Sequence, residues 1–209
     1  MFEPVLLLYM MKELVFATNN IHKLDEIRAI AGNTCVIKSL ADYCITGEIP
    51  EDYNSLEENA MQKARYIHKI LGKDCFADDT GLEIEALNNE PGVFSARYSR
   101  IGKPVFMDLP VNEGNIKKVL EKLADQTSRN ARFRTVIALI YKNKEFLFEG
   151  IIKGDILKEK SGEHGFGYDP VFRPEGYSVS FAEMDPSEKN HISHRAEAIR
   201  KMINFIGGL

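Results

Sequence analysis

The order of apolar and polar residues predicts a strand, a turn and a helix where the fold begins. Leu14 to Ala17 is a short apolar run typical of a buried strand, and the polar turn Thr18-Asn19-Asn20 follows it. Leu24, Ile27 and Ala31 then recur at helical spacing, which turns one side of the next segment toward a core. We therefore expect a strand that leads through a tight turn into an amphipathic helix.

A second helix is predicted to begin at Ser55. Ser55 and Glu58 have the spacing of a capping box, in which the two residues satisfy the free N–H groups of a helix start. One apolar stripe follows, made of Leu56, Ala60, Ala64, Ile67 and Leu71. Asp74 to Ala77 then predicts a strand that runs into Asp78-Asp79-Thr80-Gly81, after which Leu82, Ile84 and Ala86 alternate at period two.

The second half of the chain is richer in strands than the first. The segment 112–123 is amphipathic, and 131–152 is dominated by β-branched and aromatic residues, with Lys142-Asn143-Lys144 as a hairpin turn. A glycine-rich loop spans 161–174, and a last helix begins at about Ser193. Because strands and helices alternate early and hairpins come late, we expect an α/β fold with a mixed sheet flanked by helices.

Composition limits the function classes that fit. A chain of 209 residues that is 44% hydrophobic can bury a core as one domain, or as two lobes sharing a cleft. With 27 basic and 31 acidic residues the formal charge is −4, so no general positive field is available for nucleic acid. Cys35, Cys44 and Cys75 lack a metal-ligand or disulfide pattern, which favours a reducing cytoplasm.

The first ten residues, MFEPVLLLYM, are expected to be an N-terminal extension or an upstream start. They are apolar, but they lack the basic start and the small-residue cleavage pattern of a signal peptide. Met11 is followed at once by the strand-like KELVFA, so the fold is expected to occupy 11–209 as a single domain. No run approaches the roughly 20 apolar residues of a membrane span, so we expect no membrane association.

The first candidate site is the turn between the first strand and its helix, Thr18 to Lys23. Free N–H groups and the positive end of a helix dipole favour a phosphate there, and Lys23 would add a positive charge. The glycines of a Walker loop are missing. A plain strand-to-helix turn with an asparagine cap is the alternative.

The second candidate is Asp78-Asp79-Thr80-Gly81, at the end of a strand. Magnesium prefers oxygen ligands and is commonly held by one or two carboxylates together with substrate phosphates. Successive strand residues point to opposite faces, so we expect only one of the two aspartates to serve. An Asp-rich β-turn with Gly81 in a left-handed conformation is the alternative.

Glu51, Glu57 and Glu58 form an acidic cluster near the start of the second helix. Glu58 belongs to the capping box and Glu57 is expected to face solvent, which leaves Glu51 as the freest second metal ligand. The alternative for this cluster is complementation of the helix dipole.

Two further candidates lie near the end of the chain. In Gly165-Phe166-Gly167-Tyr168-Asp169-Pro170, a rigid glycine-containing loop offers Phe166 or Tyr168 for stacking on a flat ring. A tight turn with core aromatics is the alternative. In Lys189-Asn190-His191-Ile192-Ser193-His194-Arg195, cations stand at a helix start, where they oppose the dipole; an anionic or carbonyl-bearing ligand would explain them. A helix cap at Ser193 with solvated basic residues is the alternative.

Four motifs, taken together and in this order, resemble the inosine triphosphate pyrophosphatase family: TNNIHK, ADDTGLEIEAL with PGVFSARYS, GFGYDP and EKNHISHR. The resemblance covers nearly the whole chain from Met11. It implies an elongated α/β fold with a central mixed sheet and two lobes around an active-site cleft, usually as a homodimer. It also implies magnesium-dependent hydrolysis of non-standard purine nucleoside triphosphates (ITP, dITP, XTP) to the monophosphate and pyrophosphate, which removes them from the nucleotide pool.

The resemblance assigns roles to individual residues. Asp79 would be a metal ligand and the proton acceptor for the attacking water, with Glu51 as a second metal ligand. His194 and Arg195 would donate hydrogen bonds to the six-position carbonyl of the base, and an adenine amino group facing those donors would be rejected by roughly 10⁴-fold. The remaining substrate-binding residues would be Thr18, Asn19, Asn20, Ile21, His22 and Lys23 for the triphosphate, Thr80, and Phe166, Gly167, Tyr168, Asp169 and Lys189 around the base and sugar.

The sequence departs from the family pattern in two segments, and two other functions stay open. The surroundings of Glu51, IPEDYNSLEENA, lack the usual glutamate-threonine-glycine form, and 101–111 lacks the usual aspartate-rich stretch. One alternative is a pyrophosphatase for modified pyrimidine or methylated nucleotides; the other is a regulator that binds a nucleotide without cleaving it. The expected partner is a purine nucleoside triphosphate, with no nucleic acid.

Overall fold

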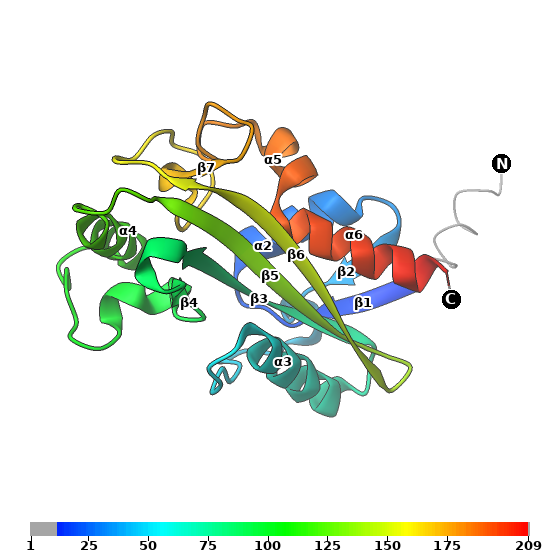
Figure 1. Cartoon of the computed structure of the whole chain (residues 1–209). Coiled ribbons are helices and arrows are strands. Elements are labelled where there is room, and N and C mark those ends of the chain that lie inside the picture. Colours follow the sequence, from blue (N-terminus) through cyan, green and yellow to red (C-terminus); the bar gives the residue numbers. More distant parts are fainter. Residues whose placement is uncertain (1–11, 209) are drawn as a thin grey trace. The chain divides into compact units, whose positions relative to one another are not determined.

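The computed structural model describes residues 12–208, and Figure 1 shows its helices and strands. The N-terminal extension predicted for residues 1–10 lies outside this range. Within it, no helix has both the length and the apolar character needed to cross a membrane. The strands are β1 (Lys12–Phe16), β2 (Cys35–Lys38), β3 (Cys75–Ile84), β4 (Glu90–Gly92), β5 (Asn130–Tyr141), β6 (Lys144–Ile156) and β7 (Phe172–Pro174). The α-helices are α2 (Ile21–Ala31), α3 (Leu56–Leu71), α4 (Val111–Lys122), α5 (Pro186–Ile192) and α6 (His194–Gly207).

One mixed sheet contains all the strands of the described residues. Its order is β2-β1-β3-β5-β6-β7, and β4 pairs with β3. β1 runs parallel to β2 and to β3, whereas β3 with β4 and β6 with β7 are antiparallel. This arrangement confirms the predicted α/β class with a mixed sheet.

The chain divides into two compact units. The first unit comprises the chain up to Asp79, residues 136–149 and the chain from Ala196 onward. The second unit comprises residues 80–135 and 150–195. The prediction that 11–209 form a single domain with two lobes around a cleft stays a prediction.

The core of the first unit packs α2 and α6 against strand residues. Leu24, Ile27 and Ala31 of α2 are buried, as their spacing predicts, and Phe16 stacks on Phe76 with ring centroids 4.6 Å apart. The rest of this core comes from β1, β2, β5 and α6. Phe76 therefore shows which side of β3 faces α2 and α6.

The helix α3 contacts the other side of β3. Its start is the predicted one: Ser55 Oγ accepts a hydrogen bond from the Glu58 N–H at 3.2 Å and donates to Glu58 Oε2 at 2.7 Å. Cys75 Sγ donates to the Ala64 carbonyl of α3 at 3.3 Å. Since Cys75 and Phe76 are consecutive, alternation along β3 separates an α3 side from the side facing α2 and α6.

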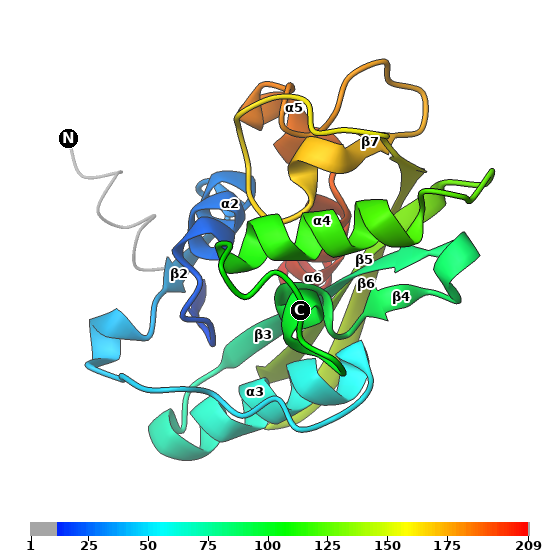
Figure 2. The same cartoon turned by 90° about the vertical axis from the view of Figure 1, so that its left-hand side faces the viewer.

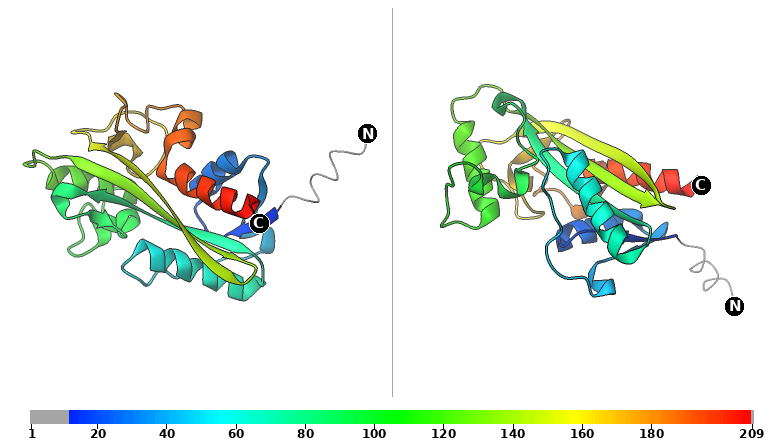
Figure 3. Two further views of the ribbon diagram at one scale, coloured as in Figure 1. Left: turned by 45° about the vertical axis from the view of Figure 1, so that its right-hand side comes forward. Right: turned by 90° about the horizontal axis from the view of Figure 1, so that it is seen from below.

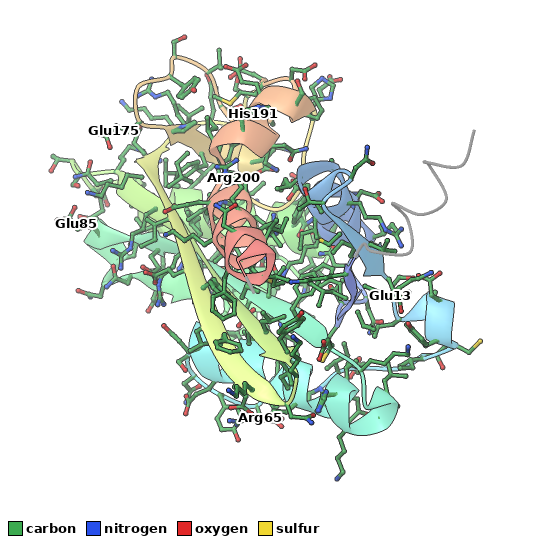
Figure 4. All side chains as sticks on the ribbon, turned by 90° about the vertical axis from the view of Figure 1, so that its right-hand side faces the viewer. Glu13, Arg65, Glu85, Glu175, His191 and Arg200 are labelled. Atoms are coloured by element: carbon green, nitrogen blue, oxygen red, sulfur yellow. The ribbon has the colours of Figure 1, made fainter. Side chains whose placement is uncertain are left out.

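The hairpin predicted at Lys142-Asn143-Lys144 is confirmed. Lys142 and Asn143 have φ of 50° and 61°, the left-handed values that a two-residue turn requires between twisted antiparallel strands. The end of the hairpin lies beside α3, as both views in Figure 3 show. There Arg65, labelled in Figure 4, donates to both carboxylate oxygens of Glu145 at 2.7 Å.

The second unit has its own core, which contains a cluster of aromatic residues. Phe133, Phe172 and Phe181 pack together, with the Phe133 and Phe172 ring centroids 4.6 Å apart. Ile116 and Val119 of α4 are buried in this core, as the amphipathic pattern predicts. The helix lies beside the short turn 95–100, a neighbourhood visible in Figure 2.

The β-turn alternative for the segment 78–81 is wrong, and one helix was not predicted. Asp78-Asp79-Thr80-Gly81 is not a β-turn, because β3 continues through it to Ile84, and Gly81 does not have a positive φ. Gly81 instead permits a close approach, since a Cβ on it would lie 2.7 Å from the carbonyl oxygen of Gly92 in β4. The helix α5 was not predicted; Asp185 caps it by accepting a hydrogen bond from the Ser187 N–H, and Pro186 follows.

This packing leads to a stability prediction. Gly81→Ala is expected to lower the free energy of unfolding by about 1–3 kcal/mol, because the added methyl group meets backbone atoms that cannot move aside freely. Gly207→Ala is the matched control, since a Cβ there meets nothing within 4 Å. Urea unfolding of both variants measures the difference, and equal stabilities would contradict the steric account.

Candidate active site

The turn between β1 and α2 is held by its own side chains. Asn20 Oδ1 accepts a hydrogen bond from the Lys23 N–H at 3.2 Å, so the asparagine-cap interpretation is correct for this side chain. Thr18 Oγ1 accepts from the Asn20 N–H at 3.1 Å, and Asn19 Nδ2 donates to the Gly47 carbonyl at 2.7 Å. The side chains of Ile21 and His22 are exposed. These contacts fix the backbone of the turn at the positive end of the helix dipole.

Asp78 and Asp79 lie on opposite sides of β3 and have different partners. Asp78 Oδ1 accepts a hydrogen bond from Lys23 Nζ of α2 at 3.0 Å. Asp79 faces α3, where its Oδ1 lies 3.6 Å from Lys63 Nζ and its Oδ2 accepts from Asn59 Nδ2 at 3.3 Å. The structure therefore separates the two carboxylates, as strand alternation predicts.

The lysine on α3 also reaches Glu51. Lys63 Nζ lies 2.5 Å from Glu51 Oε1, and only 7% of the Lys63 side chain is exposed. Lys63 was not predicted as a site residue, although a signal existed: it lies on the buried side of α3, next to Ala60, Ala64 and Ile67 in the predicted apolar stripe. A lysine on such a face needs a buried anionic partner.

Burial and charge shift the protonation of this group of residues. Burial raises the pKa of Asp79, and the positive charges of Lys63 and Lys23 oppose that rise. Burial alone would lower the pKa of Lys63, but the carboxylates of Asp79 and Glu51 outweigh it and raise that pKa. Lys63 is therefore a buried ammonium group between two acids.

The carboxylates near Lys63 fit a divalent cation that takes its remaining ligands from a substrate. No group of three or more acidic, histidine or cysteine side chains in the described part of the chain forms a metal cage. Glu51 and Asp79, however, both approach the one ammonium group of Lys63. Two carboxylates supplemented by water and phosphate oxygens are a common magnesium site.

A second group of predicted residues gathers in the glycine-rich loop of the second unit. Asp169 Oδ2 accepts a hydrogen bond from Lys189 Nζ at 2.7 Å and another from the Phe166 N–H at 2.8 Å. Asp169 and Lys189 are 3% and 5% exposed. Gly165 and Gly167 have φ of 76° and 62°, which lets the loop wrap around the Asp169 carboxylate.

The ring of Phe166 lies close to two cations. Lys189 Nζ is 5.1 Å and Arg195 Cζ 5.6 Å from its centroid. Arg195 is only 2% exposed, and its Nη2 lies 3.5 Å from Thr80 Oγ1. Thr80 Oγ1 in turn is 2.8 Å from Thr135 Oγ1. The structure thus brings together Thr80, Phe166, Lys189 and Arg195, which are far apart in the sequence.

The rings of Tyr168 and His194 are buried. The Tyr168 hydroxyl donates to the Ser95 carbonyl at 2.9 Å, and burial raises the pKa of this phenol. Tyr168 therefore belongs to the core of the second unit, as the core-aromatic alternative predicts, and contact of this residue with a base stays a prediction. His194 lies at the predicted helix start and stacks on Phe133 with centroids 4.7 Å apart.

These two groups define a class of protein. The first unit places carboxylates, lysines and a helix start together, which suits phosphate oxygens and a cation. The second unit places an aromatic ring beside buried cations, which suits a flat, carbonyl-bearing ring. An α/β protein with both features has the chemistry of a nucleotide-binding protein.

Comparison with known proteins defines the family. The model of the Ham1 family matches residues 14–205, so the chain belongs to that family. Over 193 residues it is 49% identical to a dITP/XTP pyrophosphatase of Flavobacterium psychrophilum, covering 92% of this chain and 98% of the relative. A dITP/XTP pyrophosphatase of Porphyromonas gingivalis is also 49% identical, over 94% of this chain and 98% of the relative.

Solved structures agree with this assignment. A HAM1 protein from Coxiella burnetii superposes with a TM-score of 0.82 and 36% identity, over 95% of this chain and 100% of that one. The Staphylococcus aureus Ham1 protein gives a TM-score of 0.80 and 36% identity, over 94% and 99% of the two chains. The predicted α/β fold with a mixed sheet and the family resemblance are confirmed.

Proposed function

We propose that this chain is a nucleoside triphosphate pyrophosphatase that hydrolyses dITP, XTP and ITP to the monophosphate and pyrophosphate. The names of the Flavobacterium and Porphyromonas relatives support the substrate class. The observation that carries the chemistry is the buried Asp79 carboxylate, which shares the Lys63 ammonium group with Glu51. A buried acid beside a cation site is suited to activate water next to a phosphate.

The proposed reaction breaks the bond between the α-phosphorus and the oxygen that bridges it to the β-phosphorus. A water oxygen forms the new bond to the α-phosphorus, Asp79 accepts the proton of that water, and pyrophosphate leaves. A magnesium ion held by Asp79 and Glu51 would withdraw charge from the phosphate oxygens. Burial raises the pKa of the Asp79 carboxyl group, which brings it nearer to that of an efficient general base.

The positive groups of the first unit would hold the triphosphate. Lys23 and Lys63 each carry an ammonium group beside an aspartate of β3, and the α2 helix start offers backbone N–H groups. These donors neutralise charge on the leaving pyrophosphate, so no covalent intermediate is needed.

The second unit would recognise the base. Arg195, and His194 beside it, would donate to the six-position carbonyl of hypoxanthine or xanthine, and Phe166 would cover the ring. An adenine amino group would meet donors where it needs an acceptor, which leaves buried polar groups unsatisfied. We also propose that the enzyme acts as a homodimer in the cytoplasm.

Pyrophosphate release from ITP, XTP, dITP, ATP, GTP and dUTP, with and without magnesium, tests this function. We expect metal-dependent release from the inosine and xanthosine nucleotides, with the monophosphate as the second product. Preference for pyrimidine nucleotides, or equal rates on ATP, would overturn the base assignment. Tight nucleotide binding without turnover would indicate a regulator instead.

A further inference from the structure

Three consecutive loop residues are bound by three side chains of α3. Lys63 binds Glu51. Gln62 accepts a hydrogen bond from the Asp52 N–H at 2.9 Å and donates to Asp52 Oδ2 at 2.5 Å. Asn59 accepts from the Tyr53 N–H at 2.9 Å and donates to the Tyr53 carbonyl at 3.2 Å. The first two turns of α3 therefore fix the segment that carries Glu51.

Asn59 has one contact that Gln62 lacks. Its Nδ2 also donates to Asp79 Oδ2 at 3.3 Å, and the residue is only 1% exposed. The orientation of the amide follows from the Tyr53 N–H, which can only donate and therefore requires Oδ1 opposite it. The NH₂ group must then face the Tyr53 carbonyl and the Asp79 carboxylate. One amide thus joins the Glu51 loop to Asp79.

The two contacts from α3 to Asp79 differ in character. Lys63 approaches Oδ1 with a full positive charge, at 3.6 Å, whereas Asn59 approaches Oδ2 with a neutral donor. Asn59 and Lys63 are four residues apart, so they lie on one side of the helix. A neutral donor adds no charge that would compete with a metal cation, and it contacts Oδ2, whereas Lys63 approaches Oδ1.

We propose that Asn59 is a positioning residue that orients the Asp79 carboxylate and sets its distance from Glu51. This proposal rests on the proposed function, in which both carboxylates hold the cation and Asp79 accepts the proton from water. Hydrogen bonds of this kind around metal-binding carboxylates fix the geometry of the ligands without contacting the metal. Asn59 accordingly affects the chemical step and cation affinity more than nucleotide binding.

The test compares Asn59→Ala with Gln62→Ala. Both remove a loop anchor from α3, but only Asn59→Ala removes a contact to Asp79. We measure kcat and KM for dITP, the dissociation constant of Mn²⁺ without nucleotide by calorimetry, and the melting temperature. Asn59→Leu, which has nearly the same shape but cannot form hydrogen bonds, is measured alongside in case the alanine variant unfolds.

For both Asn59 variants we expect kcat to fall and Mn²⁺ binding to weaken by about 10- to 100-fold, with KM nearly unchanged. Gln62→Ala should lower the melting temperature but keep kcat and Mn²⁺ affinity within about twofold of wild type. Wild-type kcat and Mn²⁺ affinity in a folded Asn59 variant would overturn the proposal, and so would equal losses in Gln62→Ala. If wild-type protein released no pyrophosphate, the proposed function would fail, and the Mn²⁺ affinities would still decide the role of Asn59.

Discussion

Asp79→Asn is expected to lower kcat by about 10³-fold or more while the protein stays folded. Asparagine has the shape of aspartate, but it cannot accept a proton from water and carries no charge for a cation. The fold should tolerate the change, because Lys63 keeps its 2.5 Å contact with Glu51. Pyrophosphate release at saturating nucleotide and magnesium measures kcat, and circular dichroism checks the fold.

Asp74→Asn is the matched control for this variant. Asp74 directly precedes β3, and its Oδ1 accepts a hydrogen bond at 2.7 Å from the N–H of Lys142, a residue of the hairpin turn that has no assigned role in catalysis. We expect a small loss of stability and wild-type kcat. Ordinary turnover by a folded Asp79→Asn protein would remove Asp79 from the mechanism.

Arg195→Lys is expected to reduce discrimination between ITP and ATP by about 10- to 100-fold, mainly through a lower kcat/KM for ITP. Lysine keeps the positive charge but lacks the planar set of donors that a guanidinium group presents beside Phe166 and Thr80. The correct base then loses its hydrogen bonds, whereas adenine, which never made them, loses little. The measurement is kcat/KM for both nucleotides.

Arg200→Lys makes the same exchange at an exposed position of α6 and should leave the ratio unchanged. An unchanged ratio in Arg195→Lys would assign base recognition to other residues. An equal loss for ITP and ATP would indicate that Arg195 supports the fold or binds phosphate instead.

Local signals predicted much of the fold. The capping box at Ser55, the stripe of α2 and the hairpin turn at Lys142-Asn143 depend on neighbouring residues, and all three are present. The role of Gly81 could not be predicted, because glycine serves both left-handed turns and close contacts, and only the position of Gly92 distinguishes them. The helix α5 is short, and its apolar pattern was too weak to indicate it.

The candidate site was predicted less completely than the fold. Motifs named Asp79 and Glu51, but their common partner Lys63 comes from a helix whose pattern had been assigned to packing. The Tyr168 hydroxyl donates to the carbonyl of Ser95, a residue that is distant in the sequence and was not predicted as its partner. Contacts between distant segments decided both cases, and one sequence does not contain that information.

The alternation of β3 also limits which changes in chain length the protein can tolerate. Inserting or deleting one residue between Cys75 and Asp78 would exchange the sides of the two aspartates, so that Lys63 and Asn59 would face the wrong one. A change of two residues would restore the sides but shift both acids along the strand. Natural variants of this protein should therefore carry length changes in the loops around β3 and keep the spacing within it.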